Sequence, residues 1–563
     1  ADGPIRYAPV ASTDRVWFAT DDGGLRCLDA KTGKLRWRFR GGPGDRRVLG
    51  NGRLISMWPA RGAPVLLDDT IYFAAGIWPF MGIFVHAVDA ETGKPRWVND
   101  TTGSIYIQQP HNSPAFAGLA PQGYLAAVGA AQVVPNGRAV PARLDRATGQ
   151  LEYFHLAKHR RSGGDQVAAC PTLFFSGSAA FDLPTGVDTV SLGGTRSPIL
   201  DKDTAYAGGG TLRAIYFAKP VITETKDKKD RVQTKLTLEE RWKAKLSAEL
   251  FLKAGSRLYG TAGDDVVAIE LPADDGKPAV SWRTRIKGTV SGMIAADGRL
   301  VVVTRDRIDC FGPEPVANPP QHSPAPVVSL AKNDPAREVT ARWLEASGVT
   351  GGVVVVLGLD DGRMVEALAL EPGFKIIGVD SNSRRVAGVR RRLATAGIPS
   401  ARAAVFVADP LTIGFPRYLA SLVVTEKLSN SGFAAGRAFV EQVYHVLRPY
   451  GGTAVLPVPD NRLESWRKTI ASAGLSSARL SRSGDWSLLA RSGSLPGSAP
   501  WTHQYADPSN TSVSRDKLVK APLGLLWFGG SSNTAILPRH GHGPSEQVAG
   551  GRLFIEGPDL LRA

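Results

Sequence analysis

Short runs of alternating apolar and polar residues, separated by turn residues, fill the first 312 positions of the chain. Clear examples are residues 14–20 (DRVWFAT) and 69–75 (DTIYFAA), and weaker ones follow at 203–207, 256–259 and 298–303. Alternation with a period of two is typical of strands that bury one face. The spacing of the runs predicts an all-β region of short strands joined by tight turns.

A longer unit recurs within this region. The string LRCLDAKTGKLRW at residues 25–37 returns as VHAVDAETGKPRW at 85–97 and, in weaker form, as ARLDRATGQLEY at 142–153. In each copy an aspartate opens a tight turn, a glycine supplies positive φ, and an aromatic residue follows four positions later. The unit predicts a strand, a turn and a second strand, with the aromatic ring packed between neighbouring sheets.

Radial repetition of four-stranded sheets accounts for this regularity, because each blade of a β-propeller buries both faces against its neighbours. We expect about six blades before residue 312. The repeated unit resembles the pyrroloquinoline-quinone (PQQ) type of propeller repeat, which quinoprotein dehydrogenases share with non-enzymatic outer-membrane assembly scaffolds. The resemblance implies that residues 1–312 form PQQ-repeat blades.

The resemblance would imply a bound quinone only if this sequence also contained the residues with which the dehydrogenases hold it. Those enzymes bind PQQ beneath a disulfide between adjacent cysteines and hold calcium beside a catalytic aspartate. The three cysteines here, Cys27, Cys170 and Cys310, are far apart, and no motif matches the calcium ligands. The sequence therefore argues against bound PQQ, and the aspartates of the repeats are interpreted as turn formers.

The pattern changes after a proline-rich stretch at residues 313–329, which is interpreted as a semi-rigid linker. Residues 352–357 (GVVVVL) are continuously apolar, as is typical of a strand buried on both faces of a parallel sheet. A helix is expected over residues 363–370 and a second strand over 375–380 (KIIGVD). This order of elements predicts a Rossmann-like α/β domain over residues 330–492.

Candidate binding residues fall at the tips of these two strands. Gly358, Asp360 and Gly362 form the turn after the first strand, and Asp380 ends the second strand 18 residues after Gly362. A glycine turn between strand and helix lets a ligand approach the backbone, and an acid at the next strand tip can accept hydrogen bonds from both ribose hydroxyls. This layout predicts a nucleoside-binding site.

The remainder of the domain resembles the class I S-adenosylmethionine-dependent methyltransferase family. Residues 404–409 (AVFVAD) resemble the third-strand segment whose terminal acid lies near adenine, and LRPYGGTAVL at 447–456 matches the turn before the fifth strand. The resemblance implies a seven-stranded, mostly parallel sheet. It also implies S-adenosylmethionine as cofactor, held by Gly358, Asp360, Gly362, Asp380 and Asp409.

The glycine turn departs from the pattern of that family. Asp360 stands in place of the middle glycine of Gly-x-Gly-x-Gly, and Asp361 adds a second carboxylate. Negative charge suits a cationic sulfonium, but a side chain at the middle position hinders close approach of the ligand. After the fourth strand there is no amino-methylation motif and no nucleophilic cysteine. Glu426 is the one acid that we nominate as a base, and a solvated loop residue is the alternative.

The chain carries a net charge of +16, but its arginines are spread along its length and no nucleic-acid recognition module accompanies them. We therefore expect no specific nucleic-acid partner. No apolar run reaches the roughly 18 residues that a transmembrane helix needs. The sequence thus predicts no transmembrane segment.

Strand and turn composition returns at residues 498–563. Trp501 begins a segment that resembles the opening of PQQ-type propellers, and Trp527 lies in a candidate outer strand of a blade. These residues either complete the first propeller or begin a second one, and we expect the natural protein to extend beyond both ends of the chain. His540 and His542 are the closest pair of histidines and are weak candidate metal ligands, since no third ligand is evident nearby.

Three functions follow from these patterns. The first is a bacterial methyltransferase, active in the cytoplasm, whose substrate is presented by the propeller. The second is a non-enzymatic scaffold in the periplasm or another exported compartment. Its propeller face binds a protein or polysaccharide, and its methyltransferase-like domain is degenerate. The third, a quinoprotein oxidoreductase, has the least support in the sequence.

Overall fold

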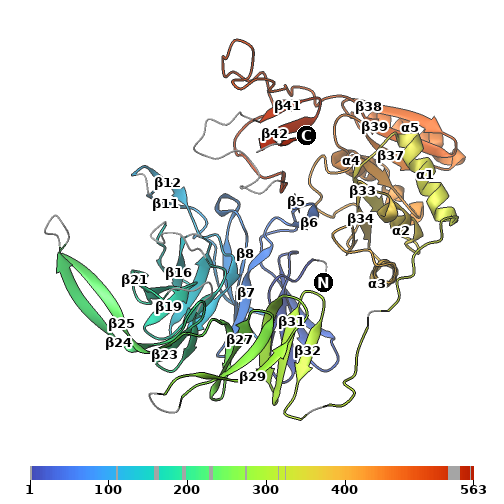
Figure 1. Ribbon diagram of the computed structural model, residues 1–563. Helices are drawn as coiled ribbons and strands as arrows, with labels where there is room; N and C mark the ends of the chain where they lie inside the picture. The colour runs from blue at the N-terminus through green and yellow to red at the C-terminus, as the bar shows by residue number, and fades with distance from the viewer. Residues whose placement is uncertain are drawn as a thin grey trace. The chain divides into compact units, whose positions relative to one another are not determined.

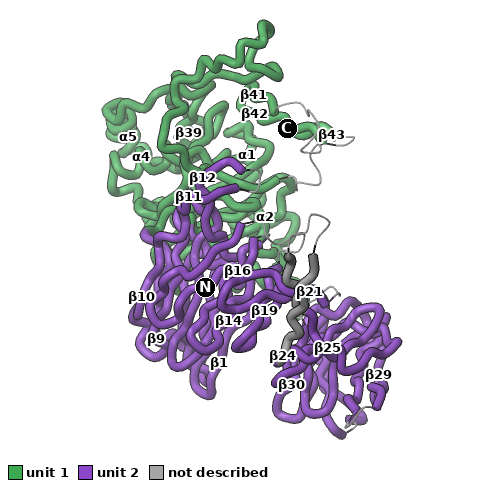
Figure 2. Tube along the Cα trace, turned by 90° about the vertical axis from the view of Figure 1, so that its left-hand side faces the viewer, with its two compact units in different colours: residues 1–3, 44–57, 323–563 green, residues 4–43, 58–322 purple. Residues whose placement is uncertain are grey.

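The computed structural model divides into two compact units (Figure 2). Unit 1 comprises residues 1–3, 44–57 and 323–563, and unit 2 comprises residues 4–43 and 58–322. The residues that the structure describes are 3–109, 112–137, 139–156, 164–192, 198–226, 232–272, 276–314, 316–323, 325–530, 546–557 and 560–563.

Unit 2 is a series of antiparallel sheets that follow one another along the chain (Figure 1). Within the described residues there are seven such sheets with three or more strands, one more than the roughly six that the sequence predicted, and one separate two-stranded pair. Most have four strands; the second gains a fifth strand, which pairs in parallel, and the seventh has three. The sheet that the sequence analysis missed is the fourth, because its strands lack a strong alternating pattern.

The first four sheets contain the following strands, in chain order. They are β1 (Val10–Ala11), β2 (Arg15–Ala19), β3 (Gly24–Asp29) and β4 (Leu35–Arg40); β7 (Ala60–Leu67), β8 (Thr70–Ala75), β9 (Phe84–Asp89), β10 (Pro95–Asn99) and the added β13 (Gly123–Tyr124); β14 (Ala126–Val128), β15 (Ala131–Asn136), β16 (Ala139–Asp145) and β17 (Leu151–Tyr153); β18 (Val167–Ala169), β19 (Leu173–Ser176), β20 (Ala179–Asp182) and β21 (Asp188–Ser191).

The remaining three sheets include a long hairpin of β24 and β25, which extends away from the other strands of the unit (Figure 1). Their strands are β22 (Ile199–Asp201), β23 (Thr204–Ala207), β24 (Leu212–Lys226) and β25 (Val232–Ala244); β26 (Glu249–Ala254), β27 (Arg257–Ala262), β28 (Asp265–Glu270) and β29 (Ala279–Arg285); β30 (Val290–Ala296), β31 (Arg299–Thr304) and β32 (Ile308–Phe311).

Hydrophobic clusters fill the spaces between successive sheets. One cluster joins Val133 and Val140 of the third sheet to Phe174 and Phe181 of the fourth, and the later sheets are joined in the same way. The first strands of successive sheets also lie side by side. Sheets that bury both faces against neighbours are the building blocks of a propeller, so unit 2 is a mostly-β array consistent with that architecture.

The repeated aspartate forms the turn in each copy of the unit, as predicted. In the first copy, Asp29 Oδ1 accepts hydrogen bonds from Thr32 N (2.9 Å) and Thr32 Oγ1 (2.8 Å), and Gly33 N donates to Asp29 O (2.9 Å). A hydrogen bond from Arg36 to the same carboxylate (2.7 Å) holds the pKa of Asp29 well below its usual range. The aspartate is therefore committed to the turn.

An aromatic ring from each repeat lies on the turn glycine of the next repeat. A Cβ atom added to Gly93 would lie 2.7 Å from the Trp37 ring. At Gly149 the corresponding distance, to the Trp97 ring, is 2.4 Å. The indole N–H of Trp97 donates to the carbonyl of Arg146 in the same turn (3.0 Å). The two positions thus require glycine for space as well as for positive φ.

A fourth copy of the turn, which the sequence comparison missed, occupies residues 182–186. Asp182 Oδ2 accepts a hydrogen bond from Thr185 N (2.9 Å). The Tyr153 ring lies on Gly186, where an added Cβ would be 2.5 Å away, and the tyrosine hydroxyl donates to a carbonyl of the turn (3.0 Å). The available signal was the string DLPTG, which keeps the spacing of aspartate, threonine and glycine.

Substituting the turn glycines tests how much the ring contact contributes to stability. Gly149→Ala places a methyl group against the Trp97 ring and should lower the free energy of unfolding by about 1–3 kcal/mol more than Gly33→Ala. Gly33 is the matched control, because it has the same turn and a positive φ, but no atom of the described residues lies within 4 Å of an added Cβ. Denaturant titration followed by tryptophan fluorescence measures the difference, and equal losses in the two variants would contradict the expectation.

Unit 1 contains a seven-stranded sheet in the order β35-β34-β33-β36-β37-β39-β38. The first five strands are parallel to one another; β39 runs antiparallel to them, and β38, which pairs antiparallel with β39, runs in the same direction as the first five. The seven-stranded, mostly parallel sheet that the sequence predicted is therefore present. Its strands are β33 (Gly352–Leu357), β34 (Phe374–Asp380), β35 (Ala403–Val407), β36 (Leu422–Val424), β37 (Gly452–Leu456), β38 (Ala478–Ser483) and β39 (Trp486–Arg491).

Helices cover both faces of this sheet. Val353 and Val355 of β33 pack on one face with α4 and α5, whereas Val354 and Val356 pack on the other face with α1, α2 and α3. This alternation explains why the β33 sequence is apolar throughout. The helices are α1 (Pro335–Ser347), α2 (Arg363–Leu370), α3 (Ser383–Thr395), α4 (Arg437–Val446) and α5 (Asp460–Ser472), with short 3-10 turns η2 (Leu428–Asn430) and η3 (Phe433–Ala435).

Residues 44–57, which lie between the first two repeats in sequence, belong to unit 1. They form a hairpin of β5 (Arg47–Gly50) and β6 (Arg53–Ser56), to which β40 (Trp527–Phe528) adds in parallel. The sequence pattern placed the hairpin among the blades and Trp527 in the outer strand of a blade. In the structure Trp527 instead pairs with Leu49 of the hairpin.

This hairpin shares the hydrophobic core of the α/β sheet. Leu54 is buried in the same cluster as Phe406 of β35, and the Arg47 guanidinium lies 5.0 Å from the centroid of the Phe406 ring. The amide of Arg47 also donates to the carbonyl of Gly414 (3.0 Å). The α/β sheet is thus packed against a segment that precedes it by roughly 300 residues in the sequence.

The last described residues of unit 1 form a small antiparallel sheet. Its strands are β41 (Gln547–Ala549), β42 (Arg552–Gly557) and β43 (Leu560–Arg562). None of the helices in the described part of the chain has the length and apolar character that a membrane-spanning helix requires.

Candidate functional site

The predicted glycine turn lies at the carboxyl end of β33, directly before α2. Gly358 and Gly362 both have positive φ, of 77° and 82°. Asp380 ends the neighbouring strand β34, so the structure brings these three candidate residues to one edge of the sheet. This edge is where α/β proteins bind their ligands.

Glu426 fills the turn with its own carboxylate. Its Oε2 accepts hydrogen bonds from the backbone amides of Asp360 (2.8 Å) and Gly362 (3.2 Å), and its Oε1 accepts from those of Met364 (3.0 Å) and Val365 (3.3 Å). Amides at a helix N-terminus are a natural anion site. In this chain that site holds the carboxylate of Glu426, which thereby caps α2.

Two opposing effects act on the pKa of Glu426. Burial raises the pKa of Glu426, while the backbone amides lower it, and burial is the larger effect. Because all four hydrogen bonds are accepted by the carboxylate, the proton-free form is the one that fits the turn. A general base also needs an accessible lone pair directed at a substrate. The bonds to the turn occupy both oxygens of Glu426.

Asp380 is also engaged by the protein itself. Its side chain is 1% exposed; Oδ2 accepts from Leu359 N (2.9 Å) and Oδ1 from Asn382 N (2.7 Å). The guanidinium of Arg385 contacts both carboxylate oxygens, at 2.9 and 3.1 Å. A ribose would have to displace this ion pair to reach the aspartate.

The space beside Gly358 into which a side chain would project is filled by the chain. A Cβ added to Gly358 would lie 2.5 Å from Ser431 N and 2.8 Å from Lys427 O, both in the loop that follows β36. Asn430 Nδ2 donates to Leu359 O (2.8 Å) and so fixes the loop on the turn. The close approach that Gly358 permits is therefore made by residues 427–431.

The other two candidate acids, Asp360 and Asp409, are exposed, whereas Asp380 is buried. Asp360 is exposed, and its carboxylate is 3.7 Å from Lys427 Nζ. Asp409 follows β35, is exposed, and accepts a hydrogen bond from Leu411 N (2.8 Å). Neither carboxylate joins Glu426 in the turn.

The residues Glu426, Arg385 and Asn430 close the turn, and the sequence analysis identified only the first, in a different role. Arg385 had a usable signal, because it stands five residues after Asp380 at the start of the following helix. The role of Asn430 had no local signal, since its partner is 71 positions away.

Metal binding finds no support in the described part of the chain. No group of three His, Cys, Asp or Glu side chains that could hold a metal ion occurs there. His540 and His542 lie outside the described residues.

Comparison with known families identifies the repeats. Residues 1–129 match the family model described as outer membrane protein assembly factor BamB. Residues 1–129 carry PQQ-type repeats. The match includes the first two turn-and-ring units, Asp29 to Trp37 and Asp89 to Trp97.

Two curated relatives match a short part of the chain. The dehydrogenase subunits of the quinone alcohol dehydrogenases of Gluconacetobacter polyoxogenes and Gluconobacter oxydans (strain 621H) are each 38% identical over 101 residues. These residues are 18% of this chain, and the chain spans only 12% of the length of each relative.

Many solved structures match parts of the chain, and three of them illustrate the range at low identity. They are BamB from Moraxella catarrhalis (16% identical, TM-score 0.33, 53% of this chain and 81% of that one), a candidate S-adenosyl-L-methionine-dependent methyltransferase from Methanococcus maripaludis (16%, 0.26, 28% and 85%) and a quinohemoprotein alcohol dehydrogenase from Pseudomonas putida (12%, 0.33, 61% and 72%). These matches assign no role to any residue of this chain.

Removing the carboxylate of Glu426 tests its role in the turn. Glu426→Ala leaves backbone amides at the start of α2 without an acceptor and should lower the free energy of unfolding of unit 1 by about 1–3 kcal/mol. Hydrogen exchange at Met364 and Val365 should accelerate, because Glu426 binds these amides. The control is Glu441→Ala, which removes only an exposed pair with Arg437 and should cost about 0.5 kcal/mol or less. Equal effects would argue against the capping role.

Proposed function

We propose that this protein is a non-enzymatic interaction scaffold, in which a PQQ-type propeller binds a protein partner and the methyltransferase-like α/β domain has lost its cofactor site. The observation that carries the proposal is the carboxylate of Glu426, which occupies the backbone amides of the glycine turn.

The turn does not fit S-adenosylmethionine. The cofactor needs the open face of the glycine turn for its backbone contacts and a free acid for its ribose. Residues 427–431 cover Gly358, and Arg385 holds Asp380. Opening the turn would break the ion pair and expose amides that are now satisfied. Methyl transfer is therefore not the function that we propose.

The surface that we propose for the partner is the two-stranded hairpin of β11 (Ile105–Gln108) and β12 (Pro114–Ala117). Tyr106 and Phe116 are 62% and 73% exposed, and their ring centroids are 5.1 Å apart in an edge-to-face contact. Paired exposed aromatic rings are enriched at protein interfaces, because they bury large areas at low entropic cost. Figure 1 shows the hairpin extending beyond the neighbouring sheet of unit 2.

The proposed location is the periplasm or another exported compartment. The family model that matches residues 1–129 describes an outer membrane protein assembly factor. A scaffold in such a compartment needs no cofactor that is made in the cytosol.

The likeness to quinone alcohol dehydrogenases raises PQQ as a second candidate ligand. The three cysteines are free; Cys27 and Cys170 are buried and Cys310 is exposed. None of these three cysteines forms the disulfide of adjacent cysteines that the PQQ-repeat resemblance implies for a quinone site. We therefore do not assign an oxidoreductase function.

A calorimetric titration with S-adenosylmethionine tests the loss of the cofactor site. The full chain should release no binding heat at millimolar ligand, because the chain already occupies the turn. Glu426→Ala serves as the comparison, since it empties the amides while Arg385 still holds Asp380. Saturable binding to the unmodified chain would contradict the proposal.

Site-specific photo-crosslinking tests the partner surface. The full chain, with Phe116 replaced by p-benzoylphenylalanine and expressed in its native host, should form a discrete protein adduct on irradiation. The matched control carries the same residue in place of Val98, which is also exposed and lies on β10. Adducts of equal yield at both positions, or adducts with polysaccharide only, would count against a protein partner at this hairpin.

A further inference from the structure

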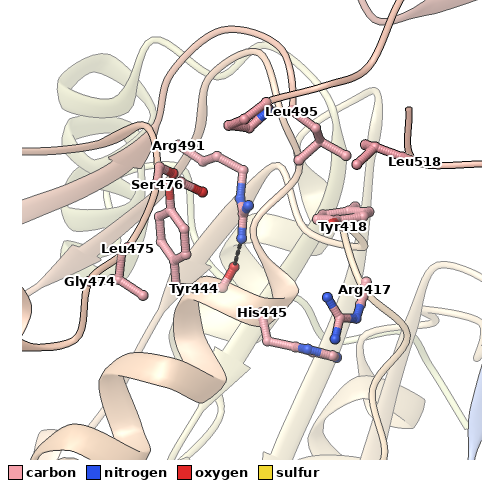
Figure 3. A pocket seen from close by; sticks show the side chains of 11 residues that line it. Arg417, Tyr418, Tyr444, His445, Gly474, Leu475, Ser476, Arg491, Leu495 and Leu518 are labelled. Atoms are coloured by element: carbon pink, nitrogen blue, oxygen red, sulfur yellow. Dashed lines mark hydrogen bonds between the residues drawn. The ribbon is translucent and has the colours of Figure 1, made fainter. Parts of the chain in front are cut away.

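A second concave site lies on unit 1, at the edge of the sheet opposite the glycine turn. It has a volume of about 360 Å³ and is lined by residues from the end of α4, the end of β39 and the loops beside them (Figure 3). Arg491 is paired with Gly452, the first residue of the parallel strand β37, which places the pocket at the amino-terminal edge of the parallel strands. The pocket is therefore separate from the turn that Glu426 fills.

Arg491 is the central group of this pocket. It is 8% exposed, and Figure 3 shows its side chain extending among Tyr444, Tyr418 and His445. Its guanidinium lies 3.9 Å from the centroid of the Tyr444 ring and 5.2 Å from that of Tyr418. Nη2 donates to the Tyr444 carbonyl, whereas Nε has no hydrogen-bond partner among the described residues. The buried cation is thus only partly satisfied.

The pocket contains no acid to neutralise Arg491. None of the 11 lining residues is an aspartate or glutamate, and in the described part of the chain no carboxylate forms an ion pair with Arg491. Burial is the main cause that lowers the pKa of Arg491, and the nearby positive charge of Arg417 adds to it. A buried guanidinium without a counter-ion is costly unless a ligand supplies the negative charge.

Arg417 and His445 complete the polar lining. Arg417 is an exposed guanidinium at the wall of the pocket. His445 Nε2 donates to the Phe415 carbonyl (3.1 Å), and burial lowers the pKa of His445, so the ring is neutral at pH 7. The charge of the pocket therefore comes from its two arginines.

The backbone at the pocket wall is held in an unfavourable conformation. Tyr418 has a positive φ of 62°, although it is not glycine, and its amide donates to the carbonyl of His445 (3.2 Å). Such a conformation persists where the surrounding contacts require it. In this pocket it places the Tyr418 ring on the opposite side of the guanidinium from Tyr444 (Figure 3).

We propose that this pocket binds the phosphate group of a small organic ligand, with Arg491 and Arg417 holding the phosphate oxygens. The two positive charges of the guanidinium groups match the two negative charges of a phosphate dianion. A carboxylate ligand would neutralise only one of the two arginines. The volume is at the low end for ligand pockets, which start at about 300 Å³. It therefore accommodates an organic group in addition to the phosphate.

Titration of the full chain with phenyl phosphate, and separately with benzoate, tests the proposal. Phenyl phosphate should bind saturably and more tightly than benzoate. Arg417→Ala should weaken its binding by about tenfold or more, because a charge-assisted hydrogen bond contributes about 1.5–3 kcal/mol. Arg417 is the residue to change, since it is exposed and its removal leaves the packing of Arg491 on the tyrosines intact.

The matched control is Arg467→Ala, an exposed arginine of α5 that does not line the pocket. It should leave the affinity for phenyl phosphate unchanged. The proposal is overturned if the unmodified chain does not bind phenyl phosphate, if benzoate binds as tightly, or if the two variants lose affinity equally. Arg491→Lys keeps the charge but not the planar fork, and should also weaken binding while the chain stays folded by circular dichroism.

Discussion

The stacking of an aromatic ring on the glycine of the next turn is the contact that joins the first four sheets of unit 2. It joins elements that are neither hydrogen-bonded strands nor sequence neighbours, because the ring belongs to one sheet and the glycine to the next. The ring excludes any side chain at the glycine, and the aspartate turn holds the glycine in place. A three-residue pattern thus sets both the local turn and the spacing between sheets.

The α/β sheet obeys a different constraint, which is that amides at a helix start must find acceptors. In a ligand-binding member of this fold the ligand meets part of that need. In this chain Glu426 meets it for four amides. The pocket around Arg491 shows the converse case, in which a buried donor lacks a full set of acceptors. The rule that buried donors need acceptors therefore distinguishes the two sites of unit 1. The glycine turn is closed by Glu426, and the pocket around Arg491 is open.

Much of the fold could be predicted from the sequence, because its signals are local. The apolar run of β33 and the aspartate, glycine and tryptophan of each repeat carry their own pattern. The state of the candidate site could not be predicted in this way. The contact of Glu426 with Asp360 spans 66 positions, and nothing in the glycine turn itself shows whether its amides are free. The pocket was also beyond reach, since Arg417 and Arg491 meet only after the chain has folded.

The hairpin of residues 44–57 has a consequence for the order in which the chain can fold. Leu54 is buried in the core of the α/β sheet, yet it is synthesised roughly 300 residues before Val353 of that core. Residues 44–57 therefore cannot reach their place in that core until the strands around residue 353 have been synthesised. The strand that pairs with the hairpin, Trp527–Phe528, arrives later still. Completion of unit 1 thus requires segments from residues 44–57 and from residues 527–528, which couples its assembly to the synthesis of the whole stretch between them.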